Sequence, residues 1–306
     1  MSRFLITGAG GFLGATVLFE GRAAGREVTA SYHEKPVRGE GLRAKAADLS
    51  RPGAAYELLV SLRPAWVINC AGLANVDACE KHPALARELN VDLPRALAAA
   101  CKEWNAHLLH ISTDSVFDGE RGGYTEADMP GPVNVYAQTK LEGEHEVLEQ
   151  LPDALVVRTN FVGFSAEGKT GLADWIIRDL SQGKRIPGFA DVIFSPLVAN
   201  DFARILFEMM DHNLSGLYHV AGSSAVSKLE FAHMLARELD LDEKLIQPAR
   251  LADAHLEARR PRNTALSSRR AEAALGRRMT SIEESIALLG EIRQSGYSQQ
   301  VAALIG

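Results

Sequence analysis

The stretch from Phe4 to Gly14 limits what this chain can fold into more than any other part of its sequence. An apolar run leads into Gly8, Gly11 and Gly14, and a segment with helical spacing follows, which predicts a buried strand, a tight turn and a helix. Glycine lets backbone N–H groups approach a ligand, and the helix N-terminus carries partial positive charge. The stretch therefore predicts a loop that holds the pyrophosphate of a dinucleotide; a glycine-rich turn in another α/β protein is the alternative.

Strand and helix patterns alternate after this loop. We expect strands over 27–32, 46–49, 65–72, 107–113 and 154–158, and helices over 52–62 and 83–104. This rhythm predicts an α/β fold with a right-handed, doubly wound parallel sheet, whose ligands bind at the carboxyl ends of the strands. Beyond residue 160 the pattern loosens, with helices expected over 171–182, 200–211, 228–239 and 281–294.

Two domains are expected from this change of pattern. Residues 1–160 form a dinucleotide-binding domain, and residues 161–306 mainly form a smaller, mixed α/β substrate domain. Residues 216–222 are expected to return to the first sheet as a further strand, which laces the two domains together and places the active site between them.

Composition excludes several classes of protein. A formal net charge of −6 argues against nucleic acid as a partner, and no run reaches the ~20 apolar residues of a membrane span. Cys70, Cys79 and Cys101 show no C-x-x-C spacing, which predicts reduced thiols, a cytoplasmic location and no metal site.

The end of the second expected strand bears on the choice of cofactor. Proteins that bind NAD through this kind of sheet often place an acid there to bind the ribose 2′-hydroxyl, but here Ser31 and Tyr32 are followed by His33, Lys35 and Arg38. The acid is absent and cations lie nearby, and both features favour NADPH, with NADH as the alternative cofactor. A solvated loop would explain the same residues.

Tyr136 and Lys140 lie four residues apart, on one face of an expected helix. A nearby ammonium favours the phenolate and is expected to lower the tyrosine pKa from ~10, so that the phenol exchanges a proton with a carbonyl or alcohol oxygen. Thr113 adds a hydroxyl at a strand end upstream. This order of residues after a nucleotide loop predicts an oxidoreductase site, although Tyr-x-x-x-Lys alone is common on surface helices.

Two longer blocks carry a family resemblance. Residues 111–119, Ile-Ser-Thr-Asp-Ser-Val-Phe-Asp-Gly, and residues 134–144, Asn-Val-Tyr-Ala-Gln-Thr-Lys-Leu-Glu-Gly-Glu, resemble the dTDP-4-dehydrorhamnose reductase family of the extended short-chain dehydrogenase/reductase superfamily. The resemblance implies a Rossmann-type domain in which Thr113, Tyr136 and Lys140 are catalytic. It also implies that Lys140 holds the nicotinamide ribose and that Asn90 supports a proton-relay water.

The loop, the strand ends and the resemblance together give the expected binding residues. For the cofactor they are Gly8, Gly11, Phe12, Leu13, Gly14, Ser31, His33, Asp48, Leu49, Cys70, Ala71, Gly72, Asn90, Tyr136 and Lys140. For the substrate they are Asp114, Ser115, Asn160, Phe161 and Arg260. Asp114 is equally explained as a turn cap. The arginine cluster around Arg259, Arg260 and Arg262 is expected to meet the diphosphate of a nucleotide-sugar, or else to be a solvated face.

The resemblance implies NAD(P)H-dependent reduction of a 4-keto nucleotide-sugar, with dTDP-4-dehydro-L-rhamnose as the best guess. Two alternatives remain open: an epimerase or dehydratase that retains NAD⁺, and a non-catalytic regulatory subunit like that of methionine adenosyltransferase. The oligomeric state that we consider for this chain is a homodimer.

Overall fold

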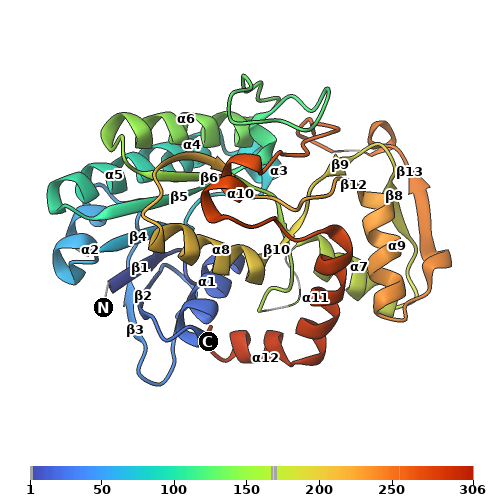
Figure 1. Cartoon of the computed structure of the whole chain (residues 1–306), viewed down its shortest axis with the longest axis horizontal. Helices are drawn as coiled ribbons and strands as arrows, with labels where there is room; N and C mark the ends of the chain where they lie inside the picture. The colour runs from blue at the N-terminus through green and yellow to red at the C-terminus, as the bar shows by residue number, and fades with distance from the viewer. Residues whose placement is uncertain (1–2, 167, 169–170, 255, 306) are drawn as a thin grey trace.

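The computed structural model describes residues 3–166, 168, 171–254 and 256–305. Its centre is a seven-stranded sheet in the order β11-β6-β5-β4-β1-β2-β3, and every neighbouring pair in it runs parallel (Figure 1). The strands are β1 (Arg3–Thr7), β2 (Glu27–Tyr32), β3 (Arg43–Ala46), β4 (Trp66–Asn69), β5 (His107–Thr113), β6 (Leu155–Thr159) and β11 (Gly216–His219). The predicted α/β fold with a doubly wound parallel sheet is confirmed.

Helices cover both faces of the sheet. They are α1 (Phe12–Ala23), α2 (Ala54–Leu62), α3 (Val76–Lys81), α4 (Pro83–Arg87), α5 (Leu93–Trp104), α6 (Val135–Gln150), α8 (Ala199–Asp211) and α10 (Arg269–Leu275). Alternation along β5 shows the two layers: Leu108 packs with α2, α5 and α6, whereas Leu109 packs with α1, α8 and α10. Because helices cover both faces of the sheet, successive residues of a strand are apolar whichever face they point to. The strands therefore appear in the sequence as continuous apolar runs.

A second body of structure lies beyond the carboxyl-end side of the sheet. It contains β7 (Phe161–Val162), β8 (Ile186–Phe189), β9 (Ile193–Phe194), β10 (Leu197–Val198), β12 (Val226–Ser227) and β13 (Ile246–Ala249), with α7 (Leu172–Ser181), α9 (Lys228–Glu238), α11 (Ile282–Gln294) and α12 (Tyr297–Ala302). The strands pair as β7 with β10, β8 with β13 and β9 with β12. A separate apolar core, which includes Phe231 and Leu289, fills this part, and β11 carries the chain back to the main sheet beside β6.

Two expected elements are placed differently by the structure. The third strand covers Arg43–Ala46 instead of 46–49, so Asp48 and Leu49 lie in the loop that follows it. The helix expected over 83–104 is divided by a π-helical turn, Glu88–Asp92, between α4 and α5. A β-carbon on Gly143 of α6 would lie 2.0 Å from the carbonyl oxygen of Asn90, so α6 packs directly on the backbone of this turn.

In the part of the chain that the structure describes, no helix is both long and apolar enough to cross a membrane.

Candidate active site

The loop between β1 and α1 contains glycines, Gly8 and Gly14 among them, that no other residue could replace without displacing backbone. Gly8 has a φ of 64°, and a β-carbon on it would lie 2.8 Å from the backbone of Ala71. A β-carbon on Gly14 would lie 2.2 Å from the carbonyl oxygen of Gly8. The strand end, the turn and the first turn of α1 are thus in contact, and the N-terminus of α1 opens beside the strand ends, where an anion would meet backbone N–H groups.

A cavity of about 630 Å³ opens over this loop. Ten of the expected cofactor residues line it: Gly8, Gly11, Phe12, Ser31, His33, Asp48, Leu49, Cys70, Ala71 and Gly72. The glycine cradle and a cavity of this size, running from the β1 loop across the ends of β2 and β4, fit an extended dinucleotide.

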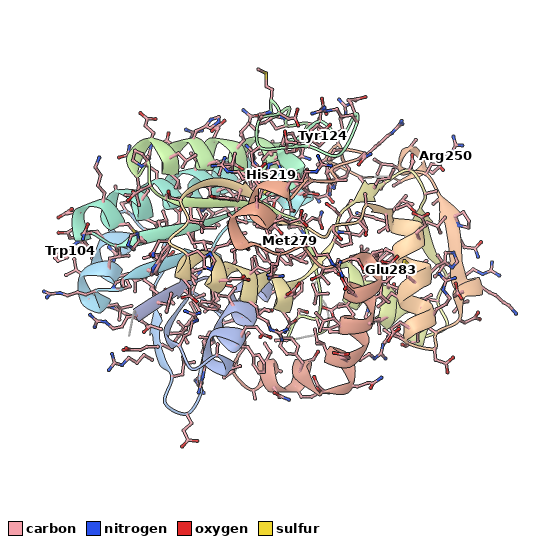
Figure 2. The ribbon with its side chains drawn as sticks, in the orientation of Figure 1. Trp104, Tyr124, His219, Arg250, Met279 and Glu283 are labelled. Carbon is pink, nitrogen blue, oxygen red and sulfur yellow. The ribbon has the colours of Figure 1, made fainter. Side chains whose placement is uncertain are left out.

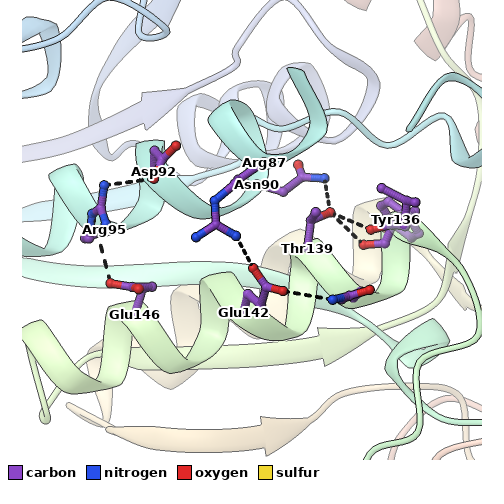
Figure 3. Close-up of polar contacts among 10 residues, drawn as sticks. Arg87, Asn90, Asp92, Arg95, Tyr136, Thr139, Glu142 and Glu146 are labelled. Atoms are coloured by element: carbon purple, nitrogen blue, oxygen red, sulfur yellow. Dashed lines mark hydrogen bonds and ion pairs between the residues drawn. The ribbon is translucent and has the colours of Figure 1, made fainter. Parts of the chain in front are cut away.

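Other expected cofactor residues lie outside the lining of this cavity. Leu13 and Gly14 are buried in α1, where Gly14 supports the loop from behind. Asn90 is buried in the π-helical turn, where its Nδ2 donates to Thr139 Oγ1 at 3.2 Å (Figure 3). The same Nδ2 donates to the carbonyl oxygen of Leu73 at 3.1 Å. Its side chain therefore ties α6 to the segment that follows Gly72, behind the wall of the cavity.

The cavity also has lining residues that are not among the expected cofactor residues. They are Gly10, Tyr32, Glu34, Lys35, Ala47, Ser50, Leu85, Leu89, Leu93, Ser165, Ala166 and Ile305. Ser165, Ala166 and Ile305 come from far along the chain, and no local pattern marks them. Lys35 was noted as a nearby cation, and it does line the cavity with His33, whereas Arg38 is not among the lining residues.

Thr113, Tyr136 and Lys140 are brought together where β5 ends and α6 begins. Thr113 is the last residue of β5, and its hydroxyl, which donates to Asp114 at 3.1 Å, lies close enough to Tyr136 in the first turn of α6 to lower the pKa of the phenol. Lys140, one turn further along α6, is buried, and its Nζ donates to the carbonyl oxygen of Ile111 at 2.6 Å. α6 begins at the N-cap Asn134, whose side chain accepts from the N–H of Ala137 at 2.8 Å.

The electrostatics of Tyr136 differ from the expectation. Burial raises the pKa of Tyr136 to about 12, while the nearby Thr113 hydroxyl lowers it and the charge of Asp114 raises it further. The predicted lowering by Lys140 is therefore wrong for this structure, because desolvation of the phenol is the larger effect and the ammonium is directed to Ile111. Burial also lowers the pKa of Lys140, to about 8.

Asp114 is the centre of a polar cluster next to Thr113. It is buried and accepts hydrogen bonds from Asn160 Nδ2 at 2.7 Å, Thr113 Oγ1 at 3.1 Å, Ser115 Oγ at 3.3 Å and the hydroxyl of Thr264. Burial raises the pKa of Asp114 in spite of these donors. Three of the five expected substrate residues, Asp114, Ser115 and Asn160, are thus in direct contact.

Phe161 and Arg260 lie apart from that cluster. The ring of Phe161 packs edge-on against Phe12 of the dinucleotide loop, with centroids 5.4 Å apart, and is stacked on Phe202. It therefore lies where the dinucleotide cavity meets the second body of structure. Arg260 pairs with Asp77 of α3 at 2.9 Å, and one of its nitrogens donates to the carbonyl oxygen of Ala258.

A second cavity, of about 460 Å³, is lined by the three arginines of the cluster together with Asp118, Glu120, Leu251, Ala252, Ala254, Leu256 and Ala258. Arg259 and Arg262 are exposed at its wall. Lys228, at the start of α9, was missed by the sequence reasoning: its ammonium interacts with the charges of both Asp114 and Arg260, but it belongs to no motif. Within the described residues, acids, histidines and cysteines form no group of three that could hold a metal ion.

The parallel sheet, the glycine cradle and the Thr113, Tyr136 and Lys140 set define an oxidoreductase of the short-chain dehydrogenase/reductase class. A family model described as the RmlD substrate binding domain matches residues 2–292, and the chain belongs to that family. The predicted membership of the dTDP-4-dehydrorhamnose reductase family is thereby confirmed.

Similar proteins include a probable low-salt glycan biosynthesis reductase, Agl14, of Haloferax volcanii, which is 37% identical over 299 residues that cover 96% of this chain and 98% of that protein. The dTDP-4-dehydrorhamnose reductase of Mycobacterium tuberculosis is 35% identical over 274 residues, or 87% of this chain and 85% of that protein. The structure of dTDP-4-dehydrorhamnose reductase from Bacillus anthracis in complex with NADP matches with a TM-score of 0.84 and 27% identity, covering 94% of this chain and 98% of that one.

Proposed function

We propose that this protein reduces the 4-keto group of a nucleotide-sugar with NADPH, and that dTDP-4-dehydro-L-rhamnose, reduced to dTDP-L-rhamnose, is its substrate. One observation carries the proposal: Thr113 at the end of β5 lies against Tyr136 in the first turn of α6, where it acts on the pKa of the phenol, and Lys140 follows one turn along the same helix. The names of the two reductases from Haloferax volcanii and Mycobacterium tuberculosis support the choice of reaction.

The cofactor is proposed to lie in the cavity above the glycine loop. Gly8, Gly11 and the start of α1 would hold its pyrophosphate, and the region of His33 and Lys35 would hold the adenosine ribose. NADPH is favoured because these two side chains can carry positive charge toward a 2′-phosphate and because the Bacillus anthracis relative has NADP bound; NADH is the alternative. When bound, the reduced nicotinamide supplies a hydride.

The residues of the chain supply the proton and the polarisation of the carbonyl. Tyr136 gives its phenolic proton to the keto oxygen as that oxygen gains negative charge, and Thr113 donates a hydrogen bond to the same oxygen. The raised pKa of Tyr136, about 12, keeps the phenol protonated and ready to donate before the reaction. Lys140 stabilises the phenolate that results, because an ammonium nearby favours the charged form.

The sugar is proposed to contact the cluster around Asp114. Asp114 is buried and already accepts four hydrogen bonds, so it would act by holding Ser115 and Asn160, which are partly exposed, toward the sugar hydroxyls. Phe161 would form an apolar wall beside the nicotinamide end, since it contacts Phe12 of the loop. Arg259 and Arg262, exposed at the second cavity, are better placed than Arg260 to meet the diphosphate, because Arg260 is paired with Asp77.

The experiment is to supply enzymatically made dTDP-4-dehydro-L-rhamnose with NADPH or NADH and to follow both cofactor oxidation and the sugar product. We expect stoichiometric oxidation, faster with NADPH, and dTDP-L-rhamnose as product. Cofactor oxidation with other 4-keto nucleotide-sugars but not with dTDP-4-dehydro-L-rhamnose would contradict the proposed substrate. Purified protein that carries tightly bound NAD⁺ and consumes no added cofactor would instead favour an epimerase or dehydratase.

A further inference from the structure

A buried ion pair lies behind the active site and is not used by the proposed reaction. Glu144 of α6 and Arg158 of β6 are 1% and 3% exposed, and their side chains form a two-pronged contact with Nε–Oε1 and Nη2–Oε2 distances of 2.9 and 2.6 Å. Ser112 of β5 adds a third donor to the same carboxylate. Buried pairs of this kind contribute little net stability compared with apolar side chains of the same shape, so stability alone gives no reason for these two charges.

Lys140 lies one helical turn before Glu144, on the same face of α6. Its surroundings are unfavourable for an ammonium: it is buried, and the groups that act on its charge are Glu144, Cys70 and Cys79, with His110 on the adjoining strand. Burial raises the pKa of Cys70 to about 12 and of Cys79 to about 11, so both thiols are neutral, and burial keeps His110 neutral as well. Of these four groups, Glu144 alone carries negative charge at neutral pH.

The contact with Arg158 determines how the Glu144 carboxylate acts on the Lys140 ammonium. Both carboxylate oxygens of Glu144 are engaged by Arg158, and Ser112 also donates to one of them. Nζ of Lys140 instead donates to the backbone carbonyl of Ile111. The carboxylate therefore attracts the ammonium through space, without taking up its N–H donors in an ion pair.

Contacts on the side of the Arg158 guanidinium that faces away from Glu144 hold it in place. Its Nη1 lies 3.5 Å from Nε2 of His219, and the guanidinium carbon lies 5.2 Å from the ring centroid of Phe117. His219 donates through Nδ1 to the backbone carbonyl oxygen of Tyr124 at 3.0 Å. Figure 2 labels both residues. Burial lowers the pKa of His219 to about 4, so this neighbour is neutral and leaves the guanidinium to Glu144.

We propose that Glu144, clamped by Arg158, is a positioning residue that keeps the Lys140 ammonium charged in its buried site while leaving its N–H donors free. The value of this arrangement for catalysis rests on the proposed function, in which Lys140 stabilises the Tyr136 phenolate and holds the cofactor ribose. The charge state of Lys140 can be measured without that function.

The test follows the titration of Lys140 in the cofactor-free protein by NMR of lysines labelled with ¹³C at Cε, with the resonance assigned by its loss in Lys140→Arg. The variants are Glu144→Gln, which keeps the shape and an acceptor, and the double variant Glu144→Gln/Arg158→Met, which leaves no unpaired charge if the single variant fails to fold. Glu142→Gln is the matched control, because it is the same change on the same helix at a half-buried residue that pairs with Arg87.

We expect the Lys140 midpoint to fall by about one pH unit in Glu144→Gln and to fall in the double variant, and to stay in place in Glu142→Gln. A purely structural pair would change the unfolding transition but not this midpoint, so an unchanged midpoint in either folded variant overturns the proposal. In turnover assays the alkaline limb of kcat should move to lower pH by the same amount, with KM for the sugar unchanged. Shifted midpoints in a protein without reductase activity would reject the proposed function and leave the charge assignment standing.

Discussion

Asn134 donates a hydrogen bond through its side-chain Nδ2 to the backbone carbonyl oxygen of Arg259, 2.8 Å away. The same side chain caps α6 through its Oδ1, so one residue connects the helix that carries Tyr136 and Lys140 to the arginine-rich segment. The carboxylate of Asp77 accepts from the N–H of Ala258 at 3.1 Å and fastens that segment at a second point.

Replacing Asn134 separates its two contacts. Asn134→Asp keeps the acceptor that caps α6 but loses the donor to Arg259, so we expect KM for the nucleotide-sugar to rise about tenfold with little change in stability. Asn134→Ala loses both contacts and should also lower the free energy of unfolding by about 1 kcal/mol. Urea unfolding and steady-state kinetics measure the two effects. An unchanged KM in the Asp variant would mean that the arginine segment does not contact substrate.

The hydroxyl of Thr113 should matter to the reaction more than to cofactor binding. Thr113→Val removes the hydroxyl that lies against Tyr136 and that is the donor proposed for the keto oxygen, so we expect kcat to fall by about 10²–10³ while the dissociation constant of NADPH changes little. Thr113→Ser keeps the hydroxyl and should retain most of the activity. Equal activity in the Val and Ser variants would remove Thr113 from the mechanism.

The buried side chain of His219 should make the free energy of unfolding depend on pH. Burial lowers its pKa from 6.5 to about 4, so the unfolded chain binds the proton first as the pH falls. The contribution of neutral His219 to the free energy of unfolding is complete above pH 6.5. It is lost as the pH falls toward 4, which lowers the free energy of unfolding by about 3 kcal/mol over the whole range. Denaturant unfolding between neutral pH and pH 4 measures this slope.

The slope should be smaller in His219→Gln, whose amide can still donate to the Tyr124 carbonyl. Some slope should remain, because burial also lowers the pKa of His110. His145→Gln, at an exposed position of α6, is the control and should leave the slope as it is in the wild type. A wild-type protein equally stable throughout this range would contradict the buried, neutral state of His219.

Gly14 tests the packing of the dinucleotide loop. Gly14→Ala places a β-carbon 2.2 Å from the Gly8 carbonyl oxygen, where only backbone can move, so we expect NADPH affinity to fall at least about tenfold and stability to fall by about 1–3 kcal/mol. Gly290→Ala is the control, since the atom it meets is the flexible end of Glu238, far from the cavity. Wild-type affinity in Gly14→Ala, measured by fluorescence titration, would show that the loop is not the pyrophosphate site.

The sequence predicted those parts of the molecule that depend on local pattern. The glycine loop, the parallel strands and the helix carrying Tyr136 and Lys140 are marked by spacing that follows directly from strand and helix geometry. The strand expected over 46–49 lies three residues earlier, since the edge strand is short, polar and half-exposed and has no apolar run to fix its limits.

Features that arise from long-range contact could not be predicted in the same way. Ser165, Ala166 and Ile305 reach the cavity only because the chain returns to it after folding. The π-helical turn at Asn90 depends on the close approach of Gly143, and the raised pKa of Tyr136 depends on burial that spacing does not reveal. The arginine cluster of the sequence indicated Arg260 as a substrate residue, but its pairing with Asp77 of α3 became visible only in three dimensions.

The most direct test of the central claim compares wild type with Tyr136→Phe in turnover of dTDP-4-dehydro-L-rhamnose by NADPH, alongside cofactor binding by both proteins. The Phe variant lacks only the phenolic oxygen, so we expect its NADPH affinity to stay within about threefold of wild type and its kcat to fall by about 10²-fold or more. Turnover retained in Tyr136→Phe would contradict the account, because the proton would then reach the sugar from another group.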